Sequence, residues 1–494
     1  MFNPFYDKNK FFDMMSEART RMNDYSRELF HSTFDMMMLG MDDIMRSVGL
    51  RHILRHKLIG GGLIPMLSSI MDFEKWETEK FIGILKGDSD ETLFDFLKET
   101  SSKVLSGIKY DHLVNNLGKQ LFGSATFEGE KIIDENDFFT LTYIPAKGTK
   151  KAVLFHQGGV LPYSDRIFRF LPETNFFDRF IEAGIDVYAM ELKGNIVTNP
   201  SMKNLTMDKL IESSHRFTDK AFEHNGGKRM ILEGYCGHGM QTAASLLADV
   251  EGMQKKVCEL MLMVSPIDGR KCNELGDIMN LFPKSMMFWN LMLTAMRGEV
   301  VKGDNLQRTI DVAKKSFFEK TTFGRFFHGW KSGLYSDITK IDDLDKRLRM
   351  DLAGAYWISP VNATLYPVPV SLAHFRTLLF TVGVSDDGLL PLRYKGKRLN
   401  FNDIKKTDLH VTAFYGDLDA MVPFQTADFM KELLGKQFTH IVHEKTGHVS
   451  YILSPNRWKE GTDRSFTPGI ISTILKHYKQ GKVSSPASAT VQTK

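Results

Sequence analysis

The sequence predicts an α/β protein built on a doubly wound, mostly parallel sheet. From about residue 126 onward, short apolar runs alternate with segments of helical pattern, which is typical of strands joined by crossover helices. One such run, Met230–Leu232, leads to a glycine-flanked cysteine, Cys236, and a helical pattern follows at once. Ligands of such sheets bind beyond the carboxyl ends of the strands, and Cys236 falls at such an end.

Residues 1–125 are expected to form a helical N-terminal region. Phe30, Phe34 and Met37 recur at helical spacing, whereas the glycine-rich stretch Leu58–Pro65 interrupts the pattern and separates helices. Two interpretations stay open for this region. It is either a helical domain packed against the catalytic core, or an amphipathic surface for a hydrophobic granule, a membrane or a partner helix.

The catalytic domain is expected over residues 126–480, where short apolar runs end at polar or glycine-rich turns. A helix is expected at Phe176–Ala183. The expected strands are Phe138–Tyr143, Lys151–Phe155, Ile185–Met190, Arg229–Leu232, Leu260–Val264, Leu409–Phe414 and His440–His443.

The segment around Cys236 has the layout of a nucleophile elbow. A strand, Gly234, the cysteine, Gly237 and a helix follow one another, as in the α/β-hydrolase fold, whose usual signature is Gly-x-Ser-x-Gly. Here cysteine holds the place of the nucleophile and His238 that of the last glycine. The helix N-terminus favours a thiolate and an oxyanion. A buried cysteine that merely packs is the alternative.

The stretch His156-Gln157-Gly158-Gly159 lies where an α/β-hydrolase places its oxyanion loop, directly after a core strand. We expect the backbone N–H of Gly237, together with that of Gln157 or Gly158, to hold an oxyanion. An ordinary glycine turn is the alternative interpretation.

Two later turns supply the acid and the base expected of such a site. Gly416 and Pro423 bracket Asp419 at the spacing of the hydrolase acid turn, with Asp417 as the competing acid. His448 follows the last strand in a Gly-His turn. The order nucleophile, acid, histidine is that of α/β-hydrolases, so Cys236, Asp419 and His448 are the expected catalytic residues. His443 lies within the strand and is expected to pack.

Residues 270–400 interrupt the alternation and are rich in Met, Phe, Trp and Leu. We expect a helical cap over the site, which would exclude water from acyl-transfer chemistry. The tail, residues 481–494, is rich in Ser, Ala and Thr and is expected to be disordered.

Charge and cysteine content exclude several classes of protein. The formal net charge is only +4 over 494 residues, which gives no indication of nucleic-acid binding. The three cysteines, Cys236, Cys258 and Cys272, form no disulfide framework and indicate a reducing compartment. There is no apolar signal region, no membrane-spanning run and no metal-ligand or phosphate-loop motif. We expect a cytoplasmic protein without metal or cofactor.

Taken together, the motifs resemble those of the polyhydroxyalkanoate synthases over about residues 135–478. Residues 234–236 (Gly-Tyr-Cys) are similar to the start of that family's Gly-Tyr-Cys-x-Gly-Gly box, and residues 172–175 (Pro-Glu-Thr-Asn) to its segment before the nucleophile. Residues 419–423 (Asp-Ala-Met-Val-Pro) resemble its Asp-His-Ile-Val-Pro turn, and residues 447–449 (Gly-His-Val) its Gly-His-Ile stretch.

The sequence also departs from that family. His238 replaces a glycine, Ala420 replaces a histidine, and residues 156–159 replace a Pro-Pro type loop. The N-terminal region shows no such likeness. The chain therefore resembles a divergent member.

The resemblance implies an acyltransferase that polymerises (R)-3-hydroxyacyl-CoA into a polyester. Cys236 would carry the acyl group, His448 would move the protons, and Asp419 would orient the imidazole. A CoA thioester is then the substrate, and the partners are the growing polyester and, through the N-terminal helices, the granule surface. A homodimer stays open. Two alternatives remain: a Cys-dependent thioesterase or esterase, and a catalytically weak granule-binding protein.

Overall fold

The computed structural model describes residues 64–88, 90–158, 165–194, 198–272, 284–301, 321–359, 368–454 and 467–483. The helical pattern predicted before residue 64 lies outside the described residues, and so does most of the tail predicted over residues 481–494. The expectation of disorder is wrong for residues 481–483, which form the last residues of helix α19 (Thr467–Val483).

An eight-stranded sheet forms the centre of the molecule, in the order β1-β2-β4-β3-β5-β6-β9-β10. The β1–β2 and β2–β4 pairs are antiparallel, and the other pairs are parallel. A mostly parallel sheet with an antiparallel edge and this exchange of its third and fourth strands is the α/β-hydrolase arrangement, so the predicted fold class is confirmed. The strands are β1 (Lys131–Glu135), β2 (Phe139–Ile144), β3 (Ala152–Gln157), β4 (Ile185–Leu192), β5 (Met230–Tyr235), β6 (Val257–Met263), β9 (His410–Gly416) and β10 (Phe438–His443).

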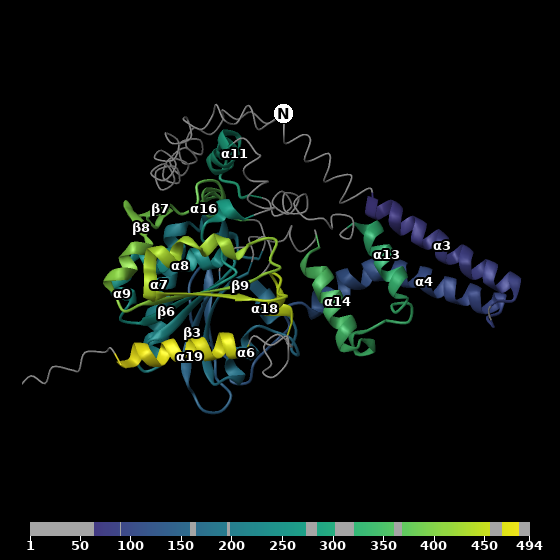
Figure 1. Cartoon of the computed structure of the whole chain (residues 1–494), viewed down its shortest axis with the longest axis horizontal. Coiled ribbons are helices and arrows are strands. Elements are labelled where there is room, and N and C mark those ends of the chain that lie inside the picture. Colours follow the sequence, from purple (N-terminus) through teal and green to yellow (C-terminus); the bar gives the residue numbers. More distant parts are fainter. Residues whose placement is uncertain are drawn as a thin grey trace, which may run out of the picture.

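Helices cover both faces of this sheet. In Figure 1, α7 and α8 lie on one face, and α6 and α19 lie on the other. This double cover explains why β3, β5 and β6 are buried at every position. The helices of this part are α6 (Phe177–Glu182), α7 (Met207–His224), α8 (Gly237–Ala248), α9 (Val250–Met253), α17 (Phe429–Leu434), α18 (Ser450–Leu453) and α19 (Thr467–Val483).

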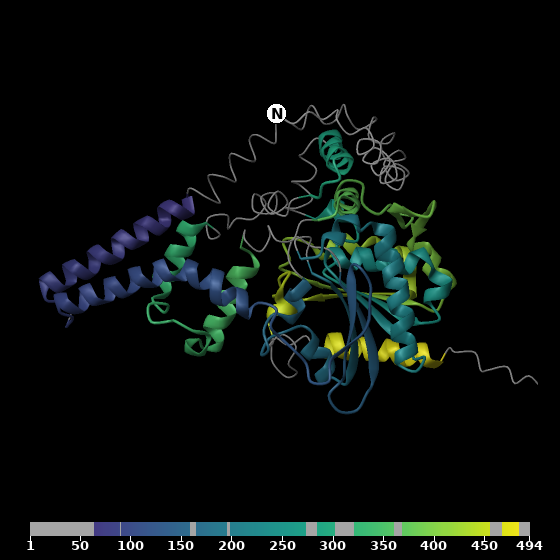
Figure 2. The same cartoon turned by 180° about the vertical axis from the view of Figure 1, so that it is seen from behind.

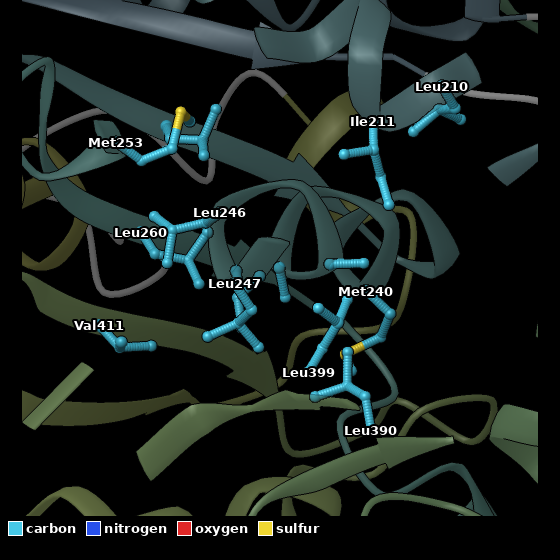
Figure 3. Packing of buried hydrophobic residues seen from close by; sticks show 14 of the residues in the cluster. Leu210, Ile211, Met240, Leu246, Leu247, Met253, Leu260, Leu390, Leu399 and Val411 are labelled. Carbon is cyan, nitrogen blue, oxygen red and sulfur yellow. The ribbon is translucent and has the colours of Figure 1, made fainter. Parts of the chain in front are cut away.

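Helix α8, which begins beside Cys236, is held firmly by apolar packing. Figure 3 shows its side chains between the sheet and the hairpin formed by β7 (Leu389–Tyr394) and β8 (Lys397–Asn400). Each fully buried Leu or Met side chain contributes about 1.5–3 kcal/mol, so the helix that carries the elbow has little freedom to shift. The residues in this contact are Met240, Leu246 and Leu247 of α8, Leu260 and Val411 of the sheet, and Leu390 and Leu399 of the hairpin.

The N-terminal helices form an arm that projects from the sheet domain. Helices α3 (Ile64–Lys86) and α4 (Leu93–Leu113) pack with α13 (Thr322–Ser332), and both views show this group standing beyond the sheet (Figures 1 and 2). Helix α13 approaches α4 closely at Gly329, whose carbonyl accepts a 2.6 Å hydrogen bond from Ser106 Oγ. A Cβ on Gly329 would lie 2.6 Å from Tyr110 Cβ, so only glycine permits this contact.

The expectation of one helical cap over residues 270–400 needs correction. Helix α13 packs on α4 in the arm, and α14 (Lys346–Trp357) packs on the π-helical turn η2 (Val114–Gly118). Among the helices that the structure describes in this segment, α11 (Lys284–Met296) and α16 (Val370–Thr381) pack together near the sheet domain, and the segment also contains the β7–β8 hairpin. The cause lies in the aromatic face of α13. Its buried members, Phe327 and Trp330, pack against partly buried Met66, Ile70, Phe73 and Trp76 of α3.

None of the described helices combines the length and the apolar character that crossing a bilayer would require.

Candidate active site

Cys236 occupies a strained turn between β5 and α8. Its backbone has φ 51° and ψ −131°, a combination that costs a non-glycine residue roughly 1–3 kcal/mol and that clusters at active sites. The turn is held in place because the Cys236 N–H donates to the carbonyl of Met263 at 2.8 Å, and its own carbonyl accepts from Gly239 N–H at 3.0 Å. This is the geometry of a nucleophile elbow, in which the side chain is pushed out of the sheet.

Two glycines make the turn sterically possible. A Cβ on Gly234 would lie 2.6 Å from Gly239 Cα, and a Cβ on Gly239 would lie 1.9 Å from Ser265 Oγ. Both distances are far below a van der Waals contact, so β5, α8 and the end of β6 can approach only where side chains are absent. The glycine requirement therefore falls on residue 239, one position after the His238 that departs from the usual signature.

Asp419 and His448 meet at the same end of the sheet. His448 Nδ1 lies 2.7 Å from Asp419 Oδ2. The other oxygen of Asp419, Oδ1, accepts backbone N–H groups of Met421 and Val422, each at 2.9 Å. The Asp419 side chain is fully buried, so this carboxylate is fixed in orientation and points at one imidazole nitrogen.

His448 bridges this carboxylate and the thiol of Cys236. Burial alone would lower the pKa of His448, but the charges of Asp419 and Cys236 and hydrogen bonds to both side chains raise it to about 10. A carboxylate and a thiolate both favour the imidazolium form. The three residues therefore form one electrostatic unit, in which Asp419 and Cys236 both favour the protonated form of His448.

The competing acid, Asp417, has a different contact. Its Oδ1 accepts the backbone N–H of Thr446 at 3.0 Å, and hydrogen bonds from backbone N–H groups, chiefly that of Thr446, lower its pKa. Asp417 thereby ties the acid turn to the loop that carries His448. Tyr235 supports the same loop, because its hydroxyl donates to the carbonyl of His448 at 2.5 Å.

The other two cysteines are buried, whereas Cys236 is partly exposed. Burial raises the pKa of Cys258 to about 12, and burial also raises that of Cys272. Neither thiol is a reactive candidate, since the thiolate is the nucleophilic form.

The residues expected to donate to an oxyanion lie in different surroundings. Gly237 is the first residue of α8, where a backbone N–H has no partner within its own helix. Gly158 needs correction, because its N–H already donates to the carbonyl of Met190 at 2.9 Å and extends the β3–β4 ladder. The side chain of Gln157 is an anchor in the core: it accepts from Ser214 Oγ at 2.7 Å and donates to Ser245 Oγ at 3.1 Å.

His156 lies behind the elbow and not in an oxyanion loop. It forms a very short contact with Glu233, and both side chains are almost completely buried. The rings of Phe168 and Phe177 pack against the imidazole, with ring centroids at 4.3 and 5.2 Å. His156 and Glu233 face each other across the β3–β5 pair, so this polar pair joins the two strands below Cys236.

His238 is completely buried. Its ring centroid lies 6.3 Å from that of Phe168, and burial, followed by the electrostatic influence of Arg376 and His156, lowers its pKa well below the ordinary value. A neutral, buried imidazole fits the packing role expected for this position. His443 also packs: its ring stacks on Phe414, and its Nδ1 lies 2.8 Å from Tyr451 Oη.

Arg376 is a residue of this region that the sequence interpretation missed. It lies on α16, and a Cβ on Gly237 would stand 3.9 Å from its Nε. A guanidinium beside the first turn of α8 adds to the positive potential that a helix N-terminus presents to an anion. No local pattern indicates it, because α16 belongs to the insertion and is distant from Cys236 in the sequence.

Within the described part of the chain, no cluster of three His, Cys, Asp or Glu side chains has an arrangement suited to holding a metal ion.

No protein-family model and no curated protein matches the chain. Among solved structures it is similar to an epoxide hydrolase of the α/β-hydrolase superfamily from hot-environment metagenomes, with 13% identity and a TM-score of 0.37 over 73% of this chain and 100% of that one.

Two esterase structures are also similar. A carboxylesterase of the thaumarchaeon Nitrososphaera gargenis has 13% identity and a TM-score of 0.39 over 70% of this chain and 98% of that one. A carboxylesterase of Bacillus subtilis has 12% identity and a TM-score of 0.34 over 71% and 94% of the two chains. At these values the assignment to the α/β-hydrolase fold rests on the strand order and the elbow.

Proposed function

We propose that the protein is an acyl-transferring enzyme that works through a covalent acyl-cysteine. The observation that carries this proposal is the pairing of His448 with a fixed carboxylate, Asp419, at 2.7 Å on one side and with the elbow cysteine, Cys236, on the other. Nucleophilic catalysis requires a nucleophile, a base in contact with it, and a third group that orients the base.

The reaction would begin with the thiolate of Cys236 attacking the carbonyl carbon of an ester or thioester. The oxyanion that forms would be held by the N–H of Gly237 at the helix N-terminus. When the tetrahedral intermediate collapses, the bond to the leaving alcohol or thiol breaks and the imidazolium of His448 donates its proton to that group. Cys236 then carries the acyl group, and His448 is neutral.

The second half-reaction needs an acceptor with a proton to lose. Neutral His448 would take that proton, the acceptor oxygen would attack the acyl-cysteine, and the Cys236 thiolate would leave. With water as acceptor the enzyme is a cysteine-dependent thioesterase or esterase. This is the simpler proposal, since the α/β-hydrolase fold and the paired histidine support it without any further assumption.

A second candidate uses the 3-hydroxyl of another acyl unit as acceptor. Repetition of that step would polymerise (R)-3-hydroxyacyl-CoA into a polyester. The specific support is the Gly-Tyr-Cys box at residues 234–236, because a thiol nucleophile exchanges readily with a CoA thioester, whereas most α/β-hydrolases carry serine.

One experiment tests the chemistry and then separates the acceptors. The purified chain is mixed with (R)-3-hydroxybutyryl-CoA, with butyryl-CoA and with a nitrophenyl ester, and CoA or nitrophenol release is followed together with the mass of the intact protein. We expect an acyl adduct on Cys236 that is absent from Cys236→Ala and present in the matched control Cys258→Ala. Free acid as the product identifies a hydrolase, and polyester identifies a polymerase. No adduct and no release with any substrate would overturn the proposal.

We also propose that the arm formed by α3, α4 and α13 contacts the surface of a polyester granule. Apolar side chains of α3 and α4 remain exposed, including Met71, Leu85 and Phe94, at 67%, 70% and 74% exposure. If polyester forms, replacing these three residues by serine should release the chain from sedimented polymer without loss of CoA release. Unchanged sedimentation would contradict this role of the arm.

A further inference from the structure

A polar cavity opens at the end of the sheet where the parallel strands begin, opposite to the end that carries Cys236. Its volume is about 150 Å³, and it lies where β3, β4 and β5 begin, whereas Cys236 follows the end of β5. Since β5 spans six residues at about 3.3 Å each, the two places are roughly 20 Å apart. The cavity is therefore separate from the proposed reaction. Its polar lining includes Tyr143, Lys150, Lys151, Asp186, His224 and Lys228.

One lysine of the lining is already neutralised. Lys150 Nζ lies 3.0 Å from Asp186 Oδ2 and donates to Tyr143 Oη at 2.7 Å. The other oxygen of Asp186 accepts from Tyr143 Oη at 3.1 Å and from the backbone N–H of Ala146 at 2.9 Å. This network holds the wall of the cavity in place. Both oxygens of Asp186 are engaged in it, so the charge of this carboxylate is already paired.

The remaining lysines leave a surplus of positive charge. Within the ranges that the structure describes, Lys151 and Lys228 have no carboxylate within 4.0 Å, and both line the cavity. Lys131 stands nearby, with Nζ 5.7 Å from the centre of the Tyr143 ring. Three lysines of the lining against one aspartate give a formal surplus of two positive charges, before Lys131 is counted.

The pKa of His224 is sensitive to these positive charges. Burial lowers its pKa, and so do the charges of Lys131 and Lys150. The imidazole is therefore neutral at physiological pH, and its Nδ1 lies 2.7 Å from Tyr188 Oη. When Nδ1 accepts the hydrogen bond of the Tyr188 hydroxyl, Nε2 carries the ring proton and is a hydrogen-bond donor. The lining thus combines ammonium groups with neutral donors.

We propose that this cavity binds the phosphate group of a small phosphorylated molecule. Lysine ammoniums are strong point charges for phosphate, and hydrogen bonds between ionised partners are about twice as strong as neutral ones. A single water needs roughly 10–15 Å³ of such space, so about 150 Å³ holds a phosphate group with some hydration. Polar side chains form most of the lining, which suits a charged ligand better than the acyl chain of the proposed substrate.

The phosphate group could belong to inorganic phosphate or to a nucleotide, and binding to the full chain distinguishes the two. Calorimetric titrations use inorganic phosphate, adenosine monophosphate and adenosine as probes, at an ionic strength held constant with sodium chloride. Both phosphates should bind saturably and adenosine should not. Tighter binding of the nucleotide would identify a phosphate ester as the natural ligand, and equal binding would identify the free ion.

Substitution of the two lysines without a carboxylate partner in the described part of the chain tests whether the cavity is the binding site. The double variant Lys151→Gln, Lys228→Gln should weaken phosphate binding at least tenfold. Lys405→Gln, an exposed lysine elsewhere on the surface, should leave it within twofold. All three side chains are exposed, so the variants should keep the wild-type melting temperature, which is measured alongside. Equal binding in the double variant, or no saturable binding of either phosphate, would overturn the proposal.

Discussion

The carboxylate of Asp419 holds His448 with one oxygen and is itself held by two backbone N–H groups with the other. The imidazole therefore cannot change partner without breaking the acid turn. Its Nδ1 faces the carboxylate, which leaves Nε2 as the nitrogen that serves Cys236.

Asp419→Asn should reduce acylation of Cys236 far more than Asp417→Asn. An amide at position 419 can present an N–H to Nδ1 and impose the wrong tautomer, a change that costs about four orders of magnitude in a serine triad. The loss can be smaller here, because a thiol deprotonates more readily than a hydroxyl. Asp417 contacts Thr446 and not the imidazole. Single-turnover acylation of the folded variants measures both effects. If Asp417→Asn lost as much acylation rate as Asp419→Asn, or more, Asp419 would not be the residue that orients the histidine.

An alkylating reagent should modify Cys236 before Cys258 or Cys272. Cys236 is partly exposed and paired with a base, whereas the other two thiols are buried with raised pKa values. Peptide mass mapping after brief iodoacetamide treatment of the native chain gives the order. The alanine variant Cys236→Ala should lose the rapid label and all acyl transfer while it keeps its melting temperature. Rapid labelling that persists in this variant would exclude Cys236 as the reactive thiol.

The stability that His448 contributes should depend on pH. Its pKa is about 10 in the folded protein and about 6.5 in an unfolded chain, so folding favours the protonated ring. The contribution is complete below about pH 6.5 and disappears as the pH rises through about 10. The free energy of unfolding of wild type and His448→Gln, measured by denaturant at several pH values, should therefore converge at high pH. A gap that is constant from pH 6 to pH 10 would contradict the thiolate–histidinium pair.

The sequence predicted the sheet best where strands are buried on both faces. β3, β5 and β6 are mostly apolar in sequence and are buried throughout. The edge strand β1 was missed, because it is largely exposed and carries an irregularity between Ile132 and Asp134. Cys236, Asp419 and His448 could be proposed because each follows a strand in a turn of recognisable composition.

The remaining features depend on contacts between distant parts of the chain. Ser106 and Gly329 lie 223 residues apart in the sequence, and no local pattern shows that α13 joins the arm and not a cap. In the same way, the Gly158 N–H is occupied only because Met190 lies opposite on β4. The role of Arg376 also depends on where α16 packs.

Breaking the buried pair below the elbow should destabilise the fold strongly. Glu233→Ala leaves His156 without its partner in a site that is closed to solvent, a change that typically costs about 3–5 kcal/mol. Glu135→Ala is the matched control. It removes an exposed carboxylate that pairs with Lys193 at 3.0 Å, and it should cost at most about 1 kcal/mol. Denaturant unfolding measures both, and similar losses would show that the buried pair has no special structural role.

Substitution should affect catalysis much less at His238 than at Gly239. His238 is buried beside Phe168 and its pKa is lowered by burial, so His238→Gly should change the unfolding free energy more than the rate. Acylation should stay within about tenfold of wild type, or about 1.4 kcal/mol of barrier. Gly239→Ala should be far worse, because its Cβ would overlap Ser265 Oγ at 1.9 Å and push α8 away from β6.

Single-turnover acylation and thermal stability of His238→Gly, His238→Ala and Gly239→Ala decide between packing and catalysis. If His238 packs, both of its variants keep most of the rate and lose stability, while Gly239→Ala loses both. A hundredfold collapse of acylation in a stable His238→Ala would instead place a second imidazole in the reaction. The base that serves Cys236 would then no longer be His448 alone, and the tight approach at Gly239 would serve to aim His238 as well as to close the elbow.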